Sequence, residues 1–334
     1  MKNNCVKKKI VPLIVMLLVM IISTNVIAQS KSWPDKEITI LVPFGIGGST
    51  DFLARNIIAP LLQKEFGVPV LVENKDGGAT MLGTLHYLDN MQKDGSVVYF
   101  TNAINLVFGR QTTKTQIDPS EDFAWIGNLR TDDYGLFVRG DAPWNTFGDL
   151  IHEILNNPGK INIGVLGSSP GHAIMLSLDE IAGIKGKYNL AIYDGGGEAR
   201  LAVLGNHIHA SILATDGTLT TVGEGEIRFL GIAGDVEHPT GIPTFNQGLE
   251  EIGIDGKIPR IGMYYCLGLQ KEVKENHKDR WDFWLNVFEK ITNNPEFDQK
   301  FEEAEFRKRI ILSEEFTEII KEIDMVAEKY SEFF

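Results

Sequence analysis

Three short apolar segments of this chain each end in a glycine-rich turn that opens onto a helical pattern. The turns span residues 44–51, 167–172 and 194–198. In the helical segment that follows the first turn, apolar residues recur every four positions, as at Leu53, Ile57 and Leu61. Strand, turn and helix in regular alternation predict an α/β fold with parallel sheets.

The same pattern predicts further elements along the chain, joined without a proline-, glycine- or serine-rich linker. Strands are predicted at 37–42, 68–72, 97–101, 123–129, 134–138, 161–166, 190–193, 208–214, 227–233 and 262–269. Helices are predicted at 51–66, 80–91, 146–156, 173–182, 198–204, 281–292 and 314–330. In the first helix we expect Ser49 or Thr50 as the N-terminal cap, Gly67 as the C-terminal cap, and a kink or a shortening at Pro60.

Length and charge limit the function classes. At about 150 residues per domain, 334 residues predict two domains. Acidic side chains outnumber basic ones by 45 to 32, for a formal charge of −13. Since phosphate binding needs basic surface, nucleic acid is a poor candidate partner.

Residues 1–28 have the layout of a cleavable signal peptide. Four lysines precede the apolar run from Ile10 to Ile22, and the cut is expected after Ala28. The run is shorter than the roughly 20 residues of a membrane-spanning helix; an uncleaved N-terminal anchor is the alternative. Cleavage would remove Cys5 and leave Cys266 alone, which we expect to lie buried in a strand. The sequence therefore predicts an exported protein.

The glycine-rich turns are candidate ligand loops. Ligands of open α/β sheets bind at the carboxyl ends of strands, and helix N-termini with free N–H groups attract anions. A dinucleotide fingerprint starting at Gly45 needs glycine where this chain has Thr50, and a Gly-Lys-Ser/Thr phosphate loop is absent. We therefore expect no nucleotide cofactor.

A serine-hydrolase interpretation remains as an alternative. Residues 167–171 read G-x-S-x-G, with Ser169 in the place of a nucleophile. The residue after it, Pro170, has no N–H to contribute to an oxyanion hole, and losing one such donor costs about 3 kcal/mol. His207 and His209 share one side of a strand, but no acidic or cysteine cluster accompanies them, so we expect no metal site.

Several segments, in order, resemble the substrate-binding proteins of tripartite tricarboxylate transporters, the TctC or Bug family. The similar segments are 33–38, 41–51, 70–75, 94–95, 122–123, 158–162, 167–172, 193–199 and 238–244. The resemblance implies a two-lobed periplasmic binding protein of the type II kind, each lobe a parallel or mixed sheet flanked by helices. It implies lobe 1 at 29–130 plus 240–334 and lobe 2 at 131–239, with strands near 123–129 and 227–233 as the hinge.

In that family a carboxylate is held between the first glycine loop and the Gly-Ser-Ser loop, partly through water. Carried over by position, the resemblance implies a ligand site that comprises Phe44, Gly45, Gly47, Gly48, Thr50, Asp51, Ala79, Thr80, Thr101, Asn102, Ser168, Ser169, His172 and Asp216. It implies no catalysis and no cofactor. It also implies a membrane permease as partner, and we expect a monomer; a sensor subunit is a further alternative.

One position departs from the family. Where lysine commonly follows the tyrosine at Tyr193, this chain has Asp194, which we add to the candidate site. An extra acid weakens the case for a tricarboxylate such as citrate. We hypothesise a ligand with one carboxylate and an amino group that Asp194 or Asp216 receives.

Overall fold

The computed structural model describes residues 33–167, 169–219, 222–223 and 225–333. The predicted signal peptide, residues 1–28, and Ser168 lie outside the described residues. The chain divides into an N-terminal unit, Met1–Lys36, and a second unit, Glu37–Phe334, which holds every element below. Within the described part of the first unit, the Trp33–Pro34 peptide bond is cis.

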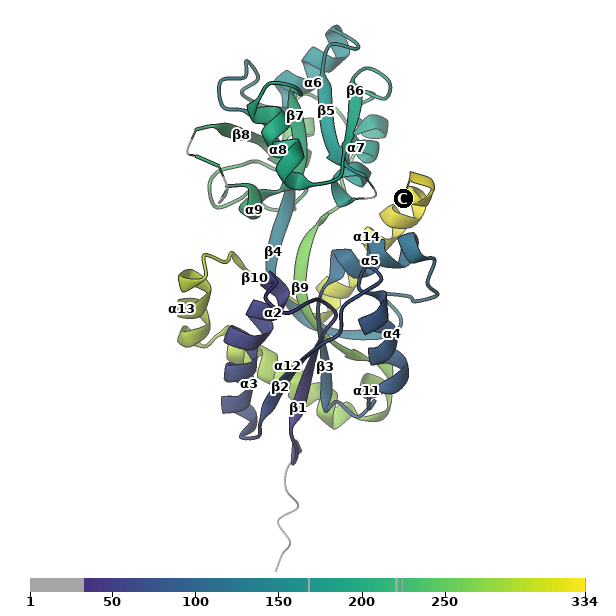
Figure 1. The fold of residues 1–334 in the computed structure, drawn as a ribbon, viewed down its shortest axis with the longest axis vertical. Helices are drawn as coiled ribbons and strands as arrows, with labels where there is room; N and C mark the ends of the chain where they lie inside the picture. The colour runs from purple at the N-terminus through teal and green to yellow at the C-terminus, as the bar shows by residue number, and fades with distance from the viewer. Residues whose placement is uncertain (1–32, 168, 220–221, 224, 334) are drawn as a thin grey trace, which may run out of the picture. The chain divides into compact units, whose positions relative to one another are not determined.

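The strands of the second unit follow the order β2-β1-β3-β9-β4-β7-β5-β6, with β10 and β8 also paired to β4 (Figure 1). Their bounds are β1 Ile38–Val42, β2 Val70–Asn74, β3 Val97–Asn102, β4 Phe123–Arg139, β5 Asn162–Leu166, β6 Asn189–Tyr193, β7 Ala210–Ala214, β8 Ile227–Ile232, β9 Gly262–Gln270 and β10 Lys308–Leu312. β1, β2 and β3 are mutually parallel, as are β5, β6 and β7. The fold is the predicted two-lobed α/β architecture. Lobe 1 contains β1–β3, β9, β10 and the first part of β4, and lobe 2 contains the rest of β4 and β5–β8.

β4 is one 17-residue strand, so the prediction of two strands at 123–129 and 134–138 is wrong. Up to Asp133 it pairs with β9 and β10, and from Tyr134 it pairs with β7 and β8. The prediction that the strand at 227–233 forms the second part of the hinge is also wrong. β8 pairs with β4 inside lobe 2, whereas β9 runs beside β4 between the two groups of strands (Figure 1).

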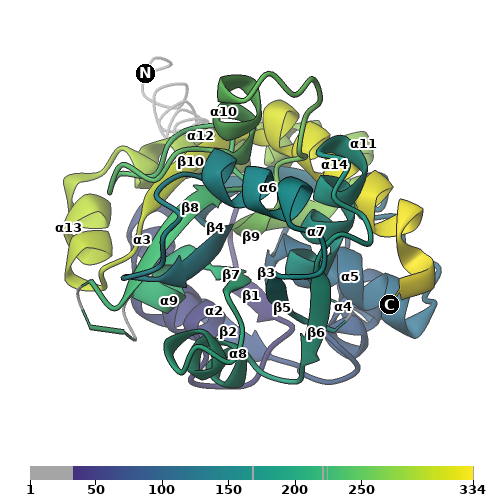
Figure 2. The same ribbon diagram turned by 90° about the horizontal axis from the view of Figure 1, so that it is seen from above.

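Helices cover both faces of each sheet; in lobe 2, α8 lies on one side of β5 and β7 and α7 on the other (Figure 2). The lobe 1 helices are α2 Ser49–Phe52, α3 Ala59–Phe66, α4 Met81–Asn90, α5 Ala103–Thr113, α11 Lys271–Asn276, α12 Lys278–Thr292, α13 Pro295–Glu303 and α14 Ser313–Lys329. The others are α6 Phe147–Asn156, α7 Pro170–Ile181, α8 Gly196–Leu204, α9 Thr215–Leu219 and α10 Phe245–Glu251. The prediction missed α5, α9, α10, α11, α13 and β10.

The first helix accommodates Pro60 by widening. α2 passes into a π-helical segment, Leu53–Ile58, and then into α3. The N–H of Ala59 donates to the carbonyl of Ala54, five residues back. Pro60 therefore stands just after a widened turn, and the carbonyl of Asn56, four residues before it, accepts a hydrogen bond from the ammonium of Lys300 at 3.4 Å. Gly67 is the predicted left-handed C-terminal cap.

α10 bears on the boundary between the lobes. It packs against α6 and β8, and the rings of Phe147 and Phe245 are 5.0 Å apart. We therefore propose that the chain returns to lobe 1 after α10 rather than at residue 240. The boundary at 130/131 stays a prediction.

The buried core of lobe 1 includes Cys266, a free thiol with no exposed surface in β9. This confirms the predicted buried strand position. Burial raises the pKa of this thiol well above its ordinary value. Among the described residues, no helix combines the length and the apolar character that crossing a membrane requires.

Candidate functional site

The first glycine loop is organised around Asp51. One carboxylate oxygen of Asp51 accepts the N–H of Gly47 at 2.9 Å, and the other accepts hydrogen bonds from Arg55 and Asn74, both at 2.9 Å. Asn74 also donates to the carbonyl of Phe44 at 3.0 Å. Burial alone would raise the pKa of Asp51, but these hydrogen bonds outweigh it and the pKa is lowered. Asp51 is thus a charged group that shapes the loop from within.

The backbone of this loop faces solvent. Gly45, Gly47 and Gly48 are exposed, Phe44 is half-buried and Thr50 is buried. Gly47 has φ +88°, a conformation that side chains rarely adopt. The predicted cap is wrong, because Gly48 is the N-cap and no side chain caps α2. The hydroxyl of Ser49 instead lies 3.0 Å from that of Tyr265 on β9.

Two further loops lie at the same edge of the lobe 1 sheet, since β1, β2 and β3 are parallel. Ala79 and Thr80 both adopt left-handed backbone conformations, with φ of 49° and 78°. The Thr80 hydroxyl is buried without a hydrogen-bond partner among the described residues. Thr101 is buried, and buried Asn102 caps α5 by accepting the N–H of Ile104. The Thr80 hydroxyl is therefore a buried polar group at this edge that can still form a hydrogen bond.

In lobe 2, Ser169 caps α7. Its hydroxyl donates to the carbonyl of Leu166 at 2.7 Å and accepts the N–H of His172 at 3.2 Å. The His172 ring is buried, which lowers its pKa, and its Nδ1 has no hydrogen-bond partner among the described residues. The ring is therefore neutral at neutral pH and keeps a free nitrogen at the start of α7.

The two candidate acids differ in their surroundings. Asp194 is exposed. Asp216 is largely buried, with one oxygen 3.0 Å from Nε2 of His238 and the other 3.7 Å from Nη2 of Arg130. Its N–H donates to Asp132, 2.9 Å away.

Arg130, Asp132, Asp216 and His238 form a buried charge cluster, of which sequence reasoning named only Asp216 as a site residue. The Arg130 guanidinium lies over the ring of Tyr265, at 4.8 Å from the centroid. Burial and the neighbouring carboxylate of Asp216 raise the pKa of Asp132 to about 6. The only signal in the sequence was the charged run at 130–133, which interrupts an apolar strand pattern.

The structure thus gathers the predicted residues into two groups. Those of lobe 1 share the carboxyl edge of β1–β3, and those of lobe 2 share the edge of β5–β7. Among the described residues, no hydrogen bond or ion pair joins the first glycine loop to the Ser169 loop. That both groups meet one ligand stays a prediction. Within the same residues, no three side chains of the metal-binding kinds are grouped to hold an ion.

Known proteins resemble this chain over most of its length. The sequence model of the family described as tripartite tricarboxylate transporter family receptor, TctC, matches residues 53–307. A protein from Cupriavidus necator, named for its position in the gbd 5' region, is 31% identical over 233 residues, which are 68% of this chain and 67% of that protein.

Solved structures show the same fold. A ligand-free TctC solute-binding protein from Polaromonas has a TM-score of 0.76 and 23% identity, over 89% of this chain and 100% of that one. MatC from Rhodopseudomonas palustris, with bound malate, has a TM-score of 0.59 and 18% identity, over 90% and 100%. By the family match, this chain belongs to the TctC family of tripartite tricarboxylate transporter receptors.

Proposed function

We propose that this protein captures a small organic carboxylate between its lobes in the periplasm and delivers it to a tripartite tricarboxylate-type permease. The observation that carries the proposal is the pair of loops at the starts of α2 and α7, one in each lobe. Each opens a helix, where N–H groups and the helix dipole favour an anion. The buried Thr80 hydroxyl and the His172 ring have unused hydrogen-bonding capacity beside these loops.

The proposed mechanism is closure of the lobes over the ligand. A carboxylate that contacts both lobes binds the closed state more tightly than the open one and so shifts the population toward closure. β4 and β9 run through the junction and are the proposed hinge. The closed form then docks on the permease.

We further propose that the protein performs no reaction on its ligand. The hydrolase alternative needs Ser169 to give its proton to a histidine, but its hydroxyl donates to the carbonyl of Leu166. Pro170 offers no N–H for an oxyanion. A role in sensing would be indicated by a neighbouring gene for a sensor kinase, and a role in transport by a neighbouring gene for a permease.

Of the two acids that could receive an amino group of the ligand, Asp194 is the better candidate. Asp216 is engaged by His238 and Arg130 inside the charge cluster, whereas Asp194 is exposed at the start of α8. We propose that Asp194 receives a cationic group of the ligand. Calorimetric titration with lactate, alanine and citrate tests this: alanine, which has one carboxylate and an amino group, should bind most tightly, and tightest binding of citrate would contradict it.

The carboxylate site itself is tested with Thr80→Val. Valine keeps the β-branched shape at φ 78° and removes an unpaired buried hydroxyl, so the fold should not lose stability. We expect weaker carboxylate binding at unchanged or higher stability. Thr112→Val, on the exposed end of α5, is the matched control and should leave binding unchanged. Unchanged affinity in Thr80→Val would contradict the placement of the ligand beside Thr80.

A further inference from the structure

The last helix of the chain, α14, belongs to lobe 1 along most of its length. Its buried face packs against α5 and β4 through residues that include Phe316, Ile320 and Ile323. Near its end, Arg110 of α5 still reaches Glu328, with 2.9 Å between Nη2 and Oε1. Up to Glu328, therefore, the helix is tied to lobe 1.

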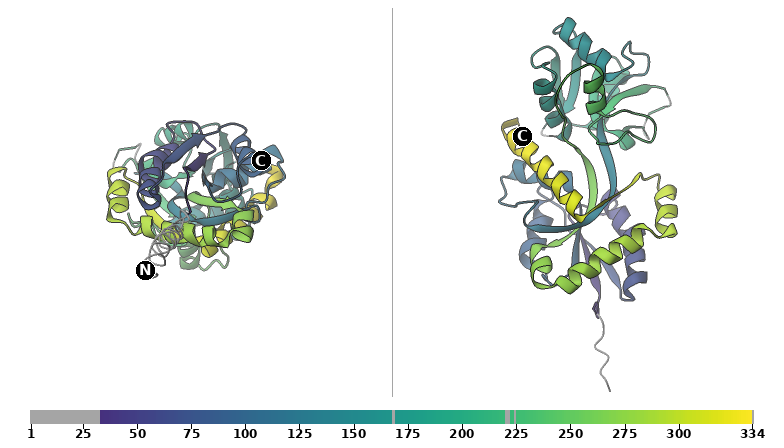
Figure 3. Two further views of the ribbon diagram at one scale, coloured as in Figure 1. Left: turned by 90° about the horizontal axis from the view of Figure 1, so that it is seen from below. Right: turned by 180° about the vertical axis from the view of Figure 1, so that it is seen from behind.

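One residue later, the contacts change to the other lobe. The ammonium of Lys329 pairs with Glu180 near the end of α7. The final 3-10 turn, Ser331–Phe333, brings the ring of Phe333 to 6.0 Å from the ring of His172, centroid to centroid, at 65° between the planes. α7 itself packs on β5 and β7 in lobe 2. The end of the chain therefore bridges the two lobes (Figure 3).

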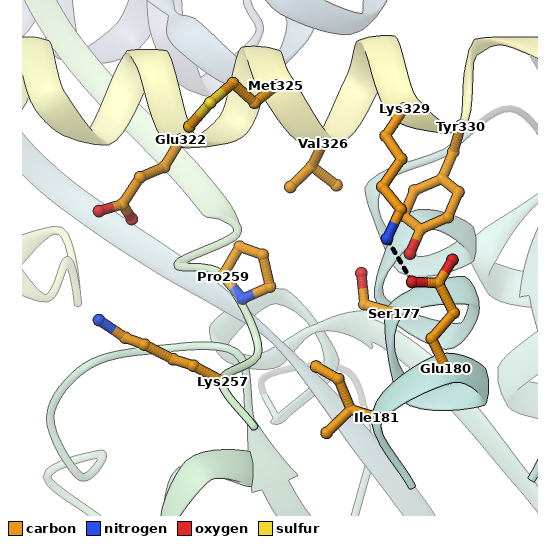
Figure 4. A pocket seen from close by; sticks show the side chains of 10 residues that line it. All are labelled: Ser177, Glu180, Ile181, Lys257, Pro259, Glu322, Met325, Val326, Lys329 and Tyr330. Atoms are coloured by element: carbon orange, nitrogen blue, oxygen red, sulfur yellow. Dashed lines mark hydrogen bonds and ion pairs between the residues drawn. The ribbon is translucent and has the colours of Figure 1, made fainter. Parts of the chain in front are cut away.

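Between these helices the packing is incomplete. A groove of about 370 Å³ separates α7 from α14, with Ile181 on one side and Met325 and Val326 on the other (Figure 4). Met325 is 62% exposed. The groove lies where α7 and α14 end, and buried Tyr330 lines it beside Lys329.

His172, the residue of lobe 2 that Phe333 contacts, belongs to the candidate ligand site. His172 lies in the first turn of α7, three residues after the cap Ser169, and its ring is 7% exposed. Phe333 is itself 43% exposed, so its ring lies beside His172 at the surface rather than in the core.

We propose that Phe333 is a positioning residue of the carboxylate site: its ring holds that of His172 at the start of α7, so that the C-terminal turn ties the ligand helix of lobe 2 to lobe 1. The proposal rests on the proposed carboxylate function. Phe333 acts on ligand affinity through the position of the His172 ring, without touching the ligand.

The test is Phe333→Ala in the otherwise native protein. The first measurement, by NMR without ligand, is the pKa of His172. Burial lowers this pKa, so exposure of the ring should raise it toward its ordinary value. The second is calorimetric affinity for malate and aspartate, which should weaken by roughly two- to ten-fold, the range of one aromatic pair. Met325→Ala, in α14 and away from His172, should change neither quantity.

The outcomes separate the two proposals. An unchanged His172 pKa in Phe333→Ala overturns the contact, and a raised pKa with unchanged affinity overturns the positioning role. If the native protein binds neither malate nor aspartate, the panel is extended to other carboxylates; binding of none contradicts the proposed function, while the pKa measurement still judges the contact. Because Phe333 is largely exposed, in a 3-10 turn that has no buried residue, the variant is expected to fold.

Discussion

Gly109, inside α5, provides the sharpest test of how the site is built. Helix propensity alone predicts that Gly109→Ala stabilises the chain by about 1 kcal/mol. However, an added Cβ would lie 2.3 Å from the carbonyl oxygen of Ala79 and 3.2 Å from the end of Met81. The first atom is backbone, so the Ala79–Thr80 loop would have to move by about 1 Å to restore ordinary contact distance. Overpacking of this kind costs about 1–3 kcal/mol.

Set against the propensity gain of about 1 kcal/mol, this cost leaves a net loss of up to about 2 kcal/mol, so we expect Gly109→Ala to lower the free energy of unfolding rather than raise it. Carboxylate affinity should fall with it, because the displaced loop carries Thr80. The control is Gly197→Ala in α8, where nothing lies within 4 Å of the added Cβ and the propensity gain should appear. Urea unfolding and calorimetry give both quantities. A Gly109→Ala chain as stable as Gly197→Ala would refute the close approach of α5 to this loop.

Three other predictions concern single side chains. Ser169→Ala should cost about 1 kcal/mol in urea unfolding by removing the cap of α7, and any esterase activity that disappears with it would contradict the binding-protein account. Asp132, with a pKa raised to about 6 by burial and Asp216, stabilises the fold when protonated and loses this contribution as the pH rises from about 4 through 6. Between pH 4 and pH 7 the free energy of unfolding of Asp132→Asn should therefore rise, relative to that of the native chain, by on the order of 3 kcal/mol. A difference in stability between the two chains that does not change with pH would argue against it. Cys266, fully buried and with a raised pKa, should react with a thiol reagent only at the rate of unfolding; rapid labelling of the native protein would show otherwise.

The sequence predicted best what local chemistry determines. The short apolar strands, the glycine turns after β1 and β5, and the left-handed cap at Gly67 follow from periodicity and from the freedom of glycine. The fold class followed from the alternation of these elements. These features depend on neighbours in the sequence, so one sequence suffices to predict them.

The sequence could not predict features that depend on distant partners. Arg130, Asp132 and Asp133 lie inside β4, although such a charged run is unusual in a buried strand. They are accommodated because Arg307 pairs with Asp133 and the N–H of Asp216 reaches Asp132. These partners stand more than 80 residues away, so the strand was predicted to break there.

Two candidate site residues have roles that their position in a motif did not reveal. Asp51 and Asp216 were assigned to the ligand as carried-over positions. In the structure Asp51 accepts hydrogen bonds from Gly47, Arg55 and Asn74, and Asp216 is held by His238. Only the fold shows that these acids already have partners.

The central claim is that the protein binds a small carboxylate, and thermal unfolding of the purified protein against a panel of carboxylates, amino acids and sugars tests it most directly. A ligand at about 100 times its dissociation constant adds about 2.7 kcal/mol to the stability of the state that binds it. For a chain of this size that raises the unfolding temperature by several degrees. The account predicts such a rise with one class of carboxylate and none with sugars. A rise with a sugar alone, or none with any carboxylate, would contradict it.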